Sequence, residues 1–314
     1  MRIGIDVLGG DYAPEATVLG SIMAWNEKQA DTQFVLIGDE KKIINLCKQE
    51  NFNPAHFEII HTTENIGMDE YPAKAFSQKP NASIVLGFNM LKKGEIDGFA
   101  SAGNTGAMLV GAMHIVKSIP GIIRPCIAAS LPKESDKSTL VLDVGINPDC
   151  KPDVLYQYAI LGSLYAELVY NVTNPKVALY NIGSEEEKGN LLTKTTFQAM
   201  KGTTDFNFVG NIEGNDIFNE EIDVIVCDGF VGNSIIKEAE AFYSLIKKRN
   251  IQDKFFDRLN FENHGGTPIL GIGAVAFIGH GISGKNAIKN IILHTENVVS
   301  AGLIEKIKQA FNND

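Results

Sequence analysis

Short apolar segments alternate with longer amphipathic ones along the chain, and this alternation constrains the fold more than any other feature. The apolar segments predict strands at 2–7, 34–38, 57–60, 98–100, 126–130, 139–142, 176–180, 206–209 and 223–227. The longer segments predict helices at 14–28, 82–93, 107–117, 153–170 and 284–311. Apolar strands separated by helices indicate an α/β fold with a mostly parallel sheet that is covered on both faces.

Gly, Asp and Asn are concentrated where these strands end. The loops concerned are 6–11, 101–106, 143–147, 181–184 and 228–233. Reactive groups collect at the carboxyl ends of parallel strands, so we expect these loops to line one polar cleft. Gly and Asn also tolerate the positive φ of tight turns, so ordinary loop chemistry is the alternative for each loop taken alone.

The loop Ser101-Ala102-Gly103-Asn104-Thr105-Gly106 joins a strand to a helix. A turn of small residues before a helix leaves backbone N–H groups unpaired and directs the positive end of the helix dipole outward, which favours anion binding. The loop matches neither G-x-G-x-x-G nor G-x-x-x-x-G-K-[ST]. A tight turn with ordinary helix capping explains this segment alone equally well.

The composition is that of a soluble globular protein, with 314 residues, 44% hydrophobic residues and a net charge of −10. This charge argues against generic nucleic-acid binding. There is no signal-peptide layout and no apolar run near the roughly 20 residues of a membrane span. The four cysteines and six histidines lack metal-ligand spacing. We therefore expect a cytoplasmic protein with free thiols, no metal and no cofactor, and leave peripheral membrane association open.

A set of motifs covers the chain nearly end to end. They are Ile5–Glu15, Met68–Ala73, Ser101–Ala107, Pro120–Pro125, Asp149–Pro152, Asn181–Gly183 with Lys188–Asn190, Asp228–Asn233, and Gly279–Gly281 with Lys285–Asn290. On these residues the chain resembles the bacterial phosphate acyltransferase family, the acyl-ACP:phosphate enzymes of phospholipid synthesis.

The resemblance implies a three-layer α/β/α sandwich like that of isocitrate and isopropylmalate dehydrogenases and of phosphotransacetylase. Residues 1–314 would form a single catalytic domain with a cleft between two lobes, and residues 243–267 a protruding basic and aromatic segment. The implied enzyme is a homodimer that moves a fatty acyl group from acyl carrier protein to inorganic phosphate. A membrane glycerol-3-phosphate acyltransferase would consume the acyl phosphate in phospholipid and lipid biosynthesis.

Phosphate is itself the nucleophile in such a reaction, so no side chain needs to be acylated. The sequence agrees, because it has no G-x-S-x-G elbow. The leaving thiolate has a pKa near ~8.5, so a strong general acid is not essential. The enzyme has to hold phosphate, align it with the carbonyl and stabilise the oxyanion.

The resemblance assigns catalysis to Lys188 and Asn233. Lys188 lies at a predicted helix start, where its charge opposes the helix dipole, and it would neutralise phosphate and the oxyanion. On sequence alone, an ion pair with the preceding glutamates is the alternative. Asn233 would donate to phosphate or the thioester carbonyl, or cap a helix beginning at Ser234. The expected phosphate cradle consists of Ser101, Gly103, Asn104, Thr105 and Gly106.

Further residues are expected to support the site. Carboxylates repel phosphate, so Asp6, Asp143 and Asp228 are expected to orient donors or cap helices. The two histidines lie in glycine-rich loops, where a bond to backbone is the alternative to a role in the cleft. The full supporting set is Asp6, Gly9, Gly10, Asp143, Asn147, Asp228, His264 and His280.

An acidic carrier protein needs a local basic patch on this acidic chain. Lys247, Lys248 and Arg249 are the best candidates. Phe255, Phe256 and Leu259 fall on one predicted helical face nearby, which suits either a membrane interface or packing against a partner subunit.

Three other functions compete with this interpretation. A phosphotransacetylase-like enzyme would use acyl-CoA as the donor. A dehydrogenase would need a metal and NAD, and the sequence shows no cluster of acidic ligands with matching arginines. A scaffold that binds lipid without catalysis would have no need of an anion site.

Overall fold

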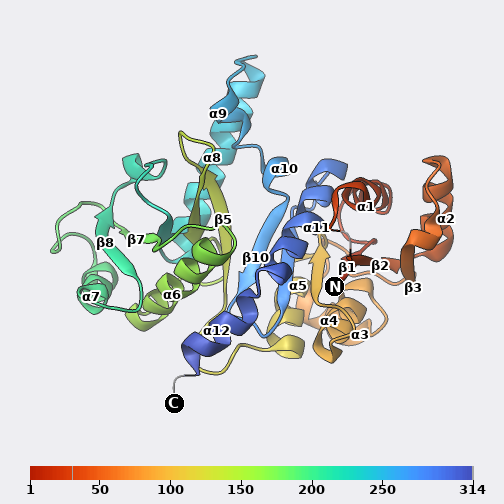
Figure 1. The fold of residues 1–314 in the computed structure, drawn as a ribbon, viewed down its shortest axis with the longest axis horizontal. Helices are drawn as coiled ribbons and strands as arrows, with labels where there is room; N and C mark the ends of the chain where they lie inside the picture. Colours follow the sequence, from red (N-terminus) through yellow and green to blue (C-terminus); the bar gives the residue numbers. More distant parts are fainter. Residues whose placement is uncertain (30, 313–314) are drawn as a thin grey trace. The chain divides into compact units, whose positions relative to one another are not determined.

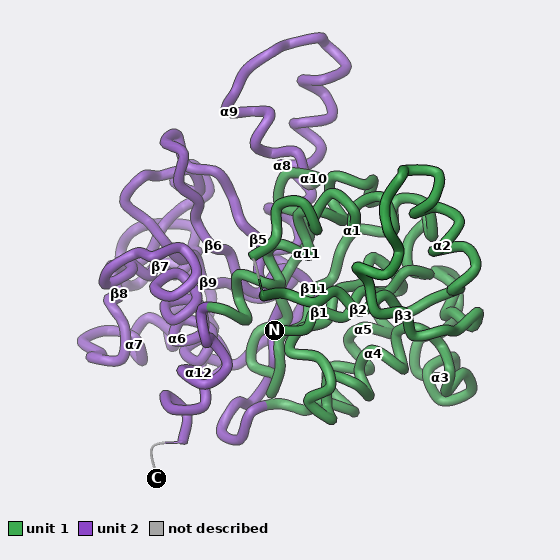
Figure 2. The backbone as a smooth tube through the Cα atoms, turned by 45° about the vertical axis from the view of Figure 1, so that its right-hand side comes forward, with its two compact units in different colours: residues 1–118, 261–300 green, residues 119–260, 301–314 purple. Residues whose placement is uncertain are grey.

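The computed structural model describes residues 1–29 and 31–312. The chain divides into two compact units (Figure 2). Unit 1 comprises residues 1–118 and 261–300, and unit 2 comprises residues 119–260 and 301–314. The expected 243–267 segment is divided between them, with residues 243–260 in unit 2 and 261–267 in unit 1. The single catalytic domain stays a prediction.

Unit 1 is built on a sheet in the order β3-β2-β1-β4-β11-β10. Figure 1 labels β1, β2, β3 and β10 of this sheet. All neighbouring strands are parallel except β10 and β11, which pair antiparallel. The strands are β1 Arg2–Asp6, β2 Gln33–Gly38, β3 Phe57–His61, β4 Gly98–Ser101, β10 Gly266–Leu270 and β11 Val275–Gly279. The helices are α1 Glu15–Glu27, α2 Glu40–Gln49, α3 Pro72–Gln78, α4 Ser83–Lys93, α5 Thr105–Gly111, α10 Phe261–His264 and α11 Lys285–Ser300, with a 3₁₀ turn at Pro54–His56 and a π-helical turn at Ala112–Val116.

Helices cover both faces of this sheet because successive residues of a strand point to opposite sides. In β4, a Cβ built on Gly98 would lie 2.6 Å from Thr295 of α11. The next residue, Phe99, points the other way, since a Cβ built on Gly87 of α4 would meet its ring at 2.2 Å. Strand β4 is therefore buried on both sides, as its continuous apolar sequence predicts.

Unit 2 has a sheet in the order β5-β6-β9-β7-β8. Strands β5 and β6 are antiparallel, and the other pairs are parallel. The strands are β5 Cys126–Pro132, β6 Ser138–Leu142, β7 Lys176–Tyr180, β8 Asn207–Ile212 and β9 Val224–Val226. The helices are α6 Pro152–Leu168, α7 Leu191–Met200, α8 Gly229–Lys248, α9 Lys254–Asp257 and α12 Leu303–Phe311, with a 3₁₀ turn at Gly214–Asp216.

The same alternation places helices on the two faces of the second sheet. Val224 of β9 packs towards α6, where a Cβ built on Gly162 would lie 2.5 Å from it. The next residue, Ile225, belongs to the core cluster that includes Ile235 and Ala239 of α8. Helices α6 and α8 therefore cover opposite faces, and the loops at the strand ends run between them.

The predicted α/β fold with a mostly parallel sheet is confirmed. Each predicted strand is present within a few residues, and the closing segment 284–311 forms two helices, α11 and α12. The predicted helix 107–117 begins earlier, at Thr105, and continues after Gly111 as the π-helical turn. The β10–β11 hairpin was not predicted. In the part of the chain that the structure describes, no helix is both long and apolar enough to cross a bilayer.

Candidate functional site

In unit 1, Asp6 at the end of β1 organises the loop after β4. Its carboxylate is buried and accepts hydrogen bonds from the Ser101 hydroxyl at 2.6 Å and from the Leu8 N–H at 3.0 Å. Burial raises the pKa of Asp6, and the bonds from Ser101 and other donors oppose that rise. The buried carboxylate fixes where the β4 loop begins.

Some of the donors expected to form the phosphate cradle already make hydrogen bonds within the protein. Ser101 accepts from the Gly103 N–H at 2.9 Å while it donates to Asp6. Asn104 caps α5 by accepting from the Ala107 N–H at 3.0 Å, and its amide group donates to carbonyls of the 67–70 loop. Among the described residues, the structure assigns no hydrogen-bond partner to the Thr105 hydroxyl or to the Thr105 and Gly106 N–H groups, and Thr105 is exposed. Thr105 and Gly106 are thus the members of the predicted cradle with donors to offer.

Gly9 and Gly10 let neighbouring loops approach each other closely. A Cβ on Gly9 would lie 2.4 Å from the Asp6 carboxylate and 2.7 Å from the Gly103 nitrogen, so no larger residue fits. Gly10 has a φ of +102° and packs against Gly281, whose carbonyl accepts from the Asp11 N–H at 2.7 Å. The loops after β1, β4 and β11 therefore meet at one edge of the unit 1 sheet.

The two predicted histidines lie at this same edge of unit 1. His280 directly follows β11, is exposed, and its carbonyl accepts from the Ser283 N–H at 3.0 Å. His264 ends α10, two residues before Gly266, which pairs with Gly279 at the end of β11. Unit 1 thus brings both histidines to the edge that carries Asp6, the two glycines and the 101–106 loop.

In unit 2, Asp143 has a role like that of Asp6. Its buried carboxylate accepts from the N–H groups of Ile127 at 3.1 Å and Asn147 at 2.6 Å, and from the Asn147 amide at 3.1 Å. Burial raises the pKa of Asp143, and the bond from the Asn147 N–H opposes the rise most. The other bond from the Asn147 amide goes to the Pro125 carbonyl at 2.8 Å, which closes the 143–147 loop onto the start of β5.

Asn233 lies inside helix α8, and the prediction that it caps a helix starting at Ser234 is wrong. Helix α8 begins at Gly229, and Asp228 is its N-cap, accepting from the Val231 N–H at 2.9 Å. The helix can start among glycines because it packs directly on the 143–147 loop: a Cβ on Gly232 would lie 2.0 Å from the Asp143 carbonyl oxygen.

The exposed Asn233 side chain faces the same loop. A Cβ built on Gly145 would lie 3.7 Å from Asn233 Oδ1. The structure assigns no hydrogen bond to the Asn233 amide within the residues it describes. The amide therefore lies beside the 143–147 loop with its donors and acceptor available.

Two asparagines hold the loop that carries Lys188. Asn181, at the end of β7, donates to the Lys188 carbonyl at 3.2 Å and accepts from the Ile182 N–H at 2.9 Å. Asn211 of β8 donates to the Glu185 carbonyl at 3.0 Å. Gly189 has a φ of +91°, and a Cβ there would lie 2.2 Å from Asn181 Oδ1. The loop backbone is thus fixed on both sides of Lys188.

The Lys188 side chain is exposed, and its stem crosses Gly183, where a Cβ would lie 2.7 Å from Lys188 Cγ. The alternative ion pair with the preceding glutamates is not formed. Glu186 instead pairs with Lys201 at 2.8 Å, and the structure assigns Lys188 no carboxylate partner among the described residues. Helix α7 begins at Leu191, three residues later than the helix start predicted at Lys188, and Asn190 caps it.

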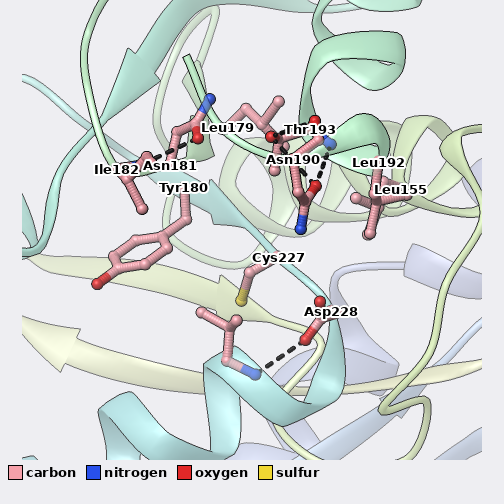
Figure 3. A pocket seen from close by; sticks show the side chains of 12 residues that line it. Leu155, Leu179, Tyr180, Asn181, Ile182, Asn190, Leu192, Thr193, Cys227 and Asp228 are labelled. Carbon is pink, nitrogen blue, oxygen red and sulfur yellow. Dashed lines mark hydrogen bonds between the residues drawn. The ribbon is translucent and has the colours of Figure 1, made fainter.

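A mostly apolar pocket lies beside this loop in unit 2 (Figure 3). Its volume is about 200 Å³, and it opens at the carboxyl ends of β7 and β9. Gly189 and Asn190 line it next to Lys188, and Asp228 lines it at the start of α8. This pocket connects the Lys188 loop with the start of the helix that carries Asn233.

The four thiols are poor nucleophiles in this fold. All four cysteines are buried and unpaired with one another. Burial raises the pKa of each thiol, to about 11 for Cys150 and well above the usual value for Cys126 and Cys227. Since the thiolate is the reactive form, none of these residues is suited to carry an acyl group.

The predicted docking residues lie at the end of α8. Lys247 pairs with Asp257 at 2.9 Å, and this contact raises the pKa of Lys247. Lys248 and Arg249 are exposed, and the structure assigns them no carboxylate partner within the residues it describes. Lys248 and Arg249 therefore carry the positive charge that could attract an acidic partner.

The predicted aromatic face beside these residues packs within unit 2. Leu259 is 8% exposed and belongs to the core cluster, against which Phe256 packs. Phe255 makes an edge-to-face contact with Phe218, with ring centroids 5.4 Å apart. The prediction that Phe255, Phe256 and Leu259 share one helical face is wrong, because α9 ends at Asp257 and Leu259 lies beyond it. Contact of this segment with a membrane or a partner subunit stays a prediction.

Comparison with known proteins identifies the family. A family model described as "Fatty acid synthesis protein" matches residues 1–306. The phosphate acyltransferase of Dictyoglomus turgidum is 39% identical, over 99% of this chain and 98% of that protein. The one from Halothermothrix orenii is 40% identical, over 100% and 99%. The chain belongs to the phosphate acyltransferase family. The predicted enzyme class, an acyltransferase, is thereby confirmed.

The fold is also similar to a solved structure. A phosphotransacetylase from Streptococcus pyogenes superposes with a TM-score of 0.68 at 17% identity, covering 97% of this chain and 94% of that one. At this identity the likeness concerns the fold alone, and it agrees with the expected relation to phosphotransacetylase.

Most polar residues near Lys188 and Asn233 were predicted from the sequence, but some residues that hold their loops in place were not. Asn211 is the next-to-last residue of β8, which the predicted strand 206–209 does not include. The apolar wall of the pocket comes from α6, α7 and α8 together with Leu179 of β7 and Cys227, and of these helices only α6 was predicted with its bounds. The β-then-α rhythm around Lys188 was the one signal that could have located the pocket. Whether all five polar loops line one cleft stays a prediction.

Proposed function

We propose that this protein transfers a fatty acyl group from the thioester of acyl carrier protein to inorganic phosphate, giving acyl phosphate for phospholipid synthesis. The single observation that carries the proposal is the Lys188 loop. An exposed lysine with no carboxylate partner in the described part of the chain is held on a backbone fixed by Asn181 and Asn211, next to an apolar pocket. A fixed cation beside apolar space suits a substrate that is part anion and part hydrocarbon.

The donors at the N-terminus of α5 would bind phosphate. The Thr105 hydroxyl and the Thr105 and Gly106 N–H groups are available, and the loop beneath them is fixed by the Asp6–Ser101 bond. Donors that are already oriented cost no reorganisation when an anion binds. Ser101, Gly103 and Asn104 would then act on phosphate by holding this loop in place.

Lys188 would stabilise the negative charge that develops as phosphate attacks the thioester. Removing one such donor from an oxyanion site typically costs about 10²–10³-fold in kcat. The Asn233 amide would donate to phosphate or to the thioester carbonyl, since it lies beside the 143–147 loop with no hydrogen bond to any described residue. Asp143, Asn147 and Asp228 would position that loop and helix without touching the anion.

The proposed reaction proceeds by direct attack of phosphate on the thioester carbonyl carbon. The new bond joins a phosphate oxygen to that carbon, the carbon–sulfur bond breaks, and the thiolate of the carrier leaves with the electron pair. The raised pKa values of the four buried thiols support this route, since they keep the cysteines protonated beside a thioester.

The experiment is to incubate the protein with acyl-ACP and radiolabelled phosphate and measure extractable labelled acyl phosphate. Lys188→Ala should lower kcat by about 10²–10³-fold. Lys194→Ala, an exposed lysine on α7, is the matched control and should retain activity. Replacing acyl-ACP by acyl-CoA tests the competing donor. Equal rates for Lys188→Ala and the control would refute the assigned role.

We further propose that Lys248 and Arg249, with Lys247, dock the acidic carrier protein. Phe242 and Leu245 of the same helix are exposed just before these cations, so this end of α8 also suits peripheral contact with a membrane. Reversing the three cations to Glu should lower kcat/KM for acyl-ACP more than for a small acyl thioester. Equal losses for both substrates would contradict the docking assignment. Gel filtration of the purified protein tests the expected homodimer.

A further inference from the structure

The pocket beside Lys188 has a wall suited to hydrocarbon. Leu155 of α6, Leu192 of α7, Val231 of α8, Leu179 of β7 and the Cys227 side chain contribute its apolar surface. Figure 3 shows Leu155 and Leu192 on one side, Tyr180 and Ile182 on the other, and Cys227 between them. Inorganic phosphate gains nothing from such a surface, whereas an alkyl chain is stabilised by leaving water for it.

The size of the pocket limits what it can take. An apolar cavity of about 150 Å³ holds benzene, which has six carbons. By the same proportion, the 200 Å³ found here holds roughly eight methylene-sized groups. This is shorter than a complete long-chain fatty acyl group but long enough for the segment next to its carbonyl.

The polar residues of the pocket lie where a carbonyl and an anion would be expected. Asn190 accepts from the Thr193 N–H at 2.9 Å through Oδ1, which leaves its amide NH₂ group to donate. Gly189 and Asn190 follow Lys188 directly, so the reacting end of a bound chain would lie at this loop. Asp228 also lines the pocket, and its carboxylate accepts from the Val231 N–H, so it is held at the start of α8.

We propose that this pocket binds the first roughly eight carbons of the acyl group, counted from the carbonyl, and thereby sets chain-length preference; the proposal rests on the acyl transfer proposed above. The carbonyl end lies towards the Lys188 loop and the chain runs between α6, α7 and α8. Carbons beyond about the eighth lie outside the pocket.

The proposal fixes how affinity depends on chain length. Each methylene that enters the pocket should tighten binding about fourfold, and methylenes that remain outside should add little. A plot of log Kd against chain length should therefore fall steadily and level off near about eight carbons. A surface groove without an end would give no such break.

Leu192 and Leu191 provide a matched pair of variants. Leu192 lines the pocket from the first turn of α7, while its neighbour Leu191 is 83% exposed and does not line it. Leu192→Trp should fill part of the pocket, and Leu191→Trp should add the same ring outside it. Leu191 is exposed and Leu192 is only partly buried, both in the first turn of α7, so both variants are expected to fold.

The test is calorimetric titration of the wild type and both variants with n-alkylphosphonates of two, four, six, eight and ten carbons. These stable probes carry a phosphate-like head and a simple chain. For the wild type, Kd should fall to octylphosphonate and then level off. Leu192→Trp should weaken octylphosphonate binding about tenfold or more while leaving ethylphosphonate unchanged, and Leu191→Trp should match the wild type.

The binding test is independent of turnover. A Kd that does not change with chain length, no binding of octylphosphonate, or equal effects of the two tryptophan variants would overturn the pocket assignment. If the protein makes no acyl phosphate but the titrations follow the expected pattern, the proposed function fails, and what remains is a pocket that binds alkyl chains of limited length. If it makes acyl phosphate and the titrations fail, the reverse holds.

Discussion

Gly189→Ala tests whether the fixed backbone beside Lys188 matters for activity. Gly189 has a φ of +91°, and an alanine Cβ would lie 2.1 Å from Thr193 Oγ1 and 2.2 Å from Asn181 Oδ1. The left-handed backbone costs a non-glycine residue about 1–2 kcal/mol. Displacing Asn181 also breaks its bonds to Ile182 and Lys188, each worth about 0.5–1.5 kcal/mol. The total is about 2–5 kcal/mol, of which about 1–3 kcal/mol comes from Asn181.

Gly202→Ala is the matched control for this prediction. Gly202 also has a positive φ, of +74°, but a Cβ there has nothing within 4 Å. The two variants share the backbone strain and differ in the clash with Asn181 and Thr193. If this difference of about 1–3 kcal/mol raises the activation free energy by displacing the Lys188 loop, kcat/KM for acyl phosphate formation should be about 5- to 150-fold lower in Gly189→Ala than in Gly202→Ala. Equal kcat/KM values for the two variants would refute the reasoning.

Three further predictions concern stability. Burial raises the pKa of Asp6 in the folded protein, so protonation of Asp6 stabilises the fold below its unfolded pKa, and this stabilisation is lost as pH rises through the folded pKa. In urea unfolding between about pH 4 and 7, the free energy of unfolding of the wild type should therefore fall relative to that of Asp6→Asn. A rise in the wild-type value relative to the variant would contradict this. Asp228→Ala removes the α8 cap and should cost about 1 kcal/mol in urea unfolding, while Asp228→Asn should cost clearly less. Lys133→Met leaves Asp223 without its buried partner at 2.8 Å and should cost about 3–5 kcal/mol; recovery in the double variant with Asp223→Asn checks that the unpaired charge is the cause.

The fold could be predicted from local patterns because most of its strands are continuous apolar runs. Strands β2 and β9 are buried along most of their length, and such runs separated by helices permit little other than a covered parallel sheet. The β10–β11 hairpin was not predicted because β10 begins at Gly266 and contains Pro268, and both residue types disfavour a strand. Pairing with β11 outweighs those preferences.

The candidate site could be predicted in kind but not in its internal bonding. The Gly, Asp and Asn residues at strand ends indicated polar loops, and a helix start was predicted at Lys188, three residues before α7 begins. The start of α8 was misplaced because Gly229 and Gly232 are weak helix formers, yet close packing on Asp143 favours them. The bonds from Asn181 to Lys188 and from Asn211 to Glu185 join residues 7 and 26 positions apart, so no local pattern contains them.

The release of free thiol from acyl-ACP in the absence of phosphate tests the central claim most directly. Direct attack by phosphate predicts no thiol above the uncatalysed background until phosphate is added, and then one thiol for each acyl phosphate formed. An acyl-enzyme route predicts a burst of about one thiol per active site without phosphate, together with a protein mass increased by one acyl group. That burst would contradict the account.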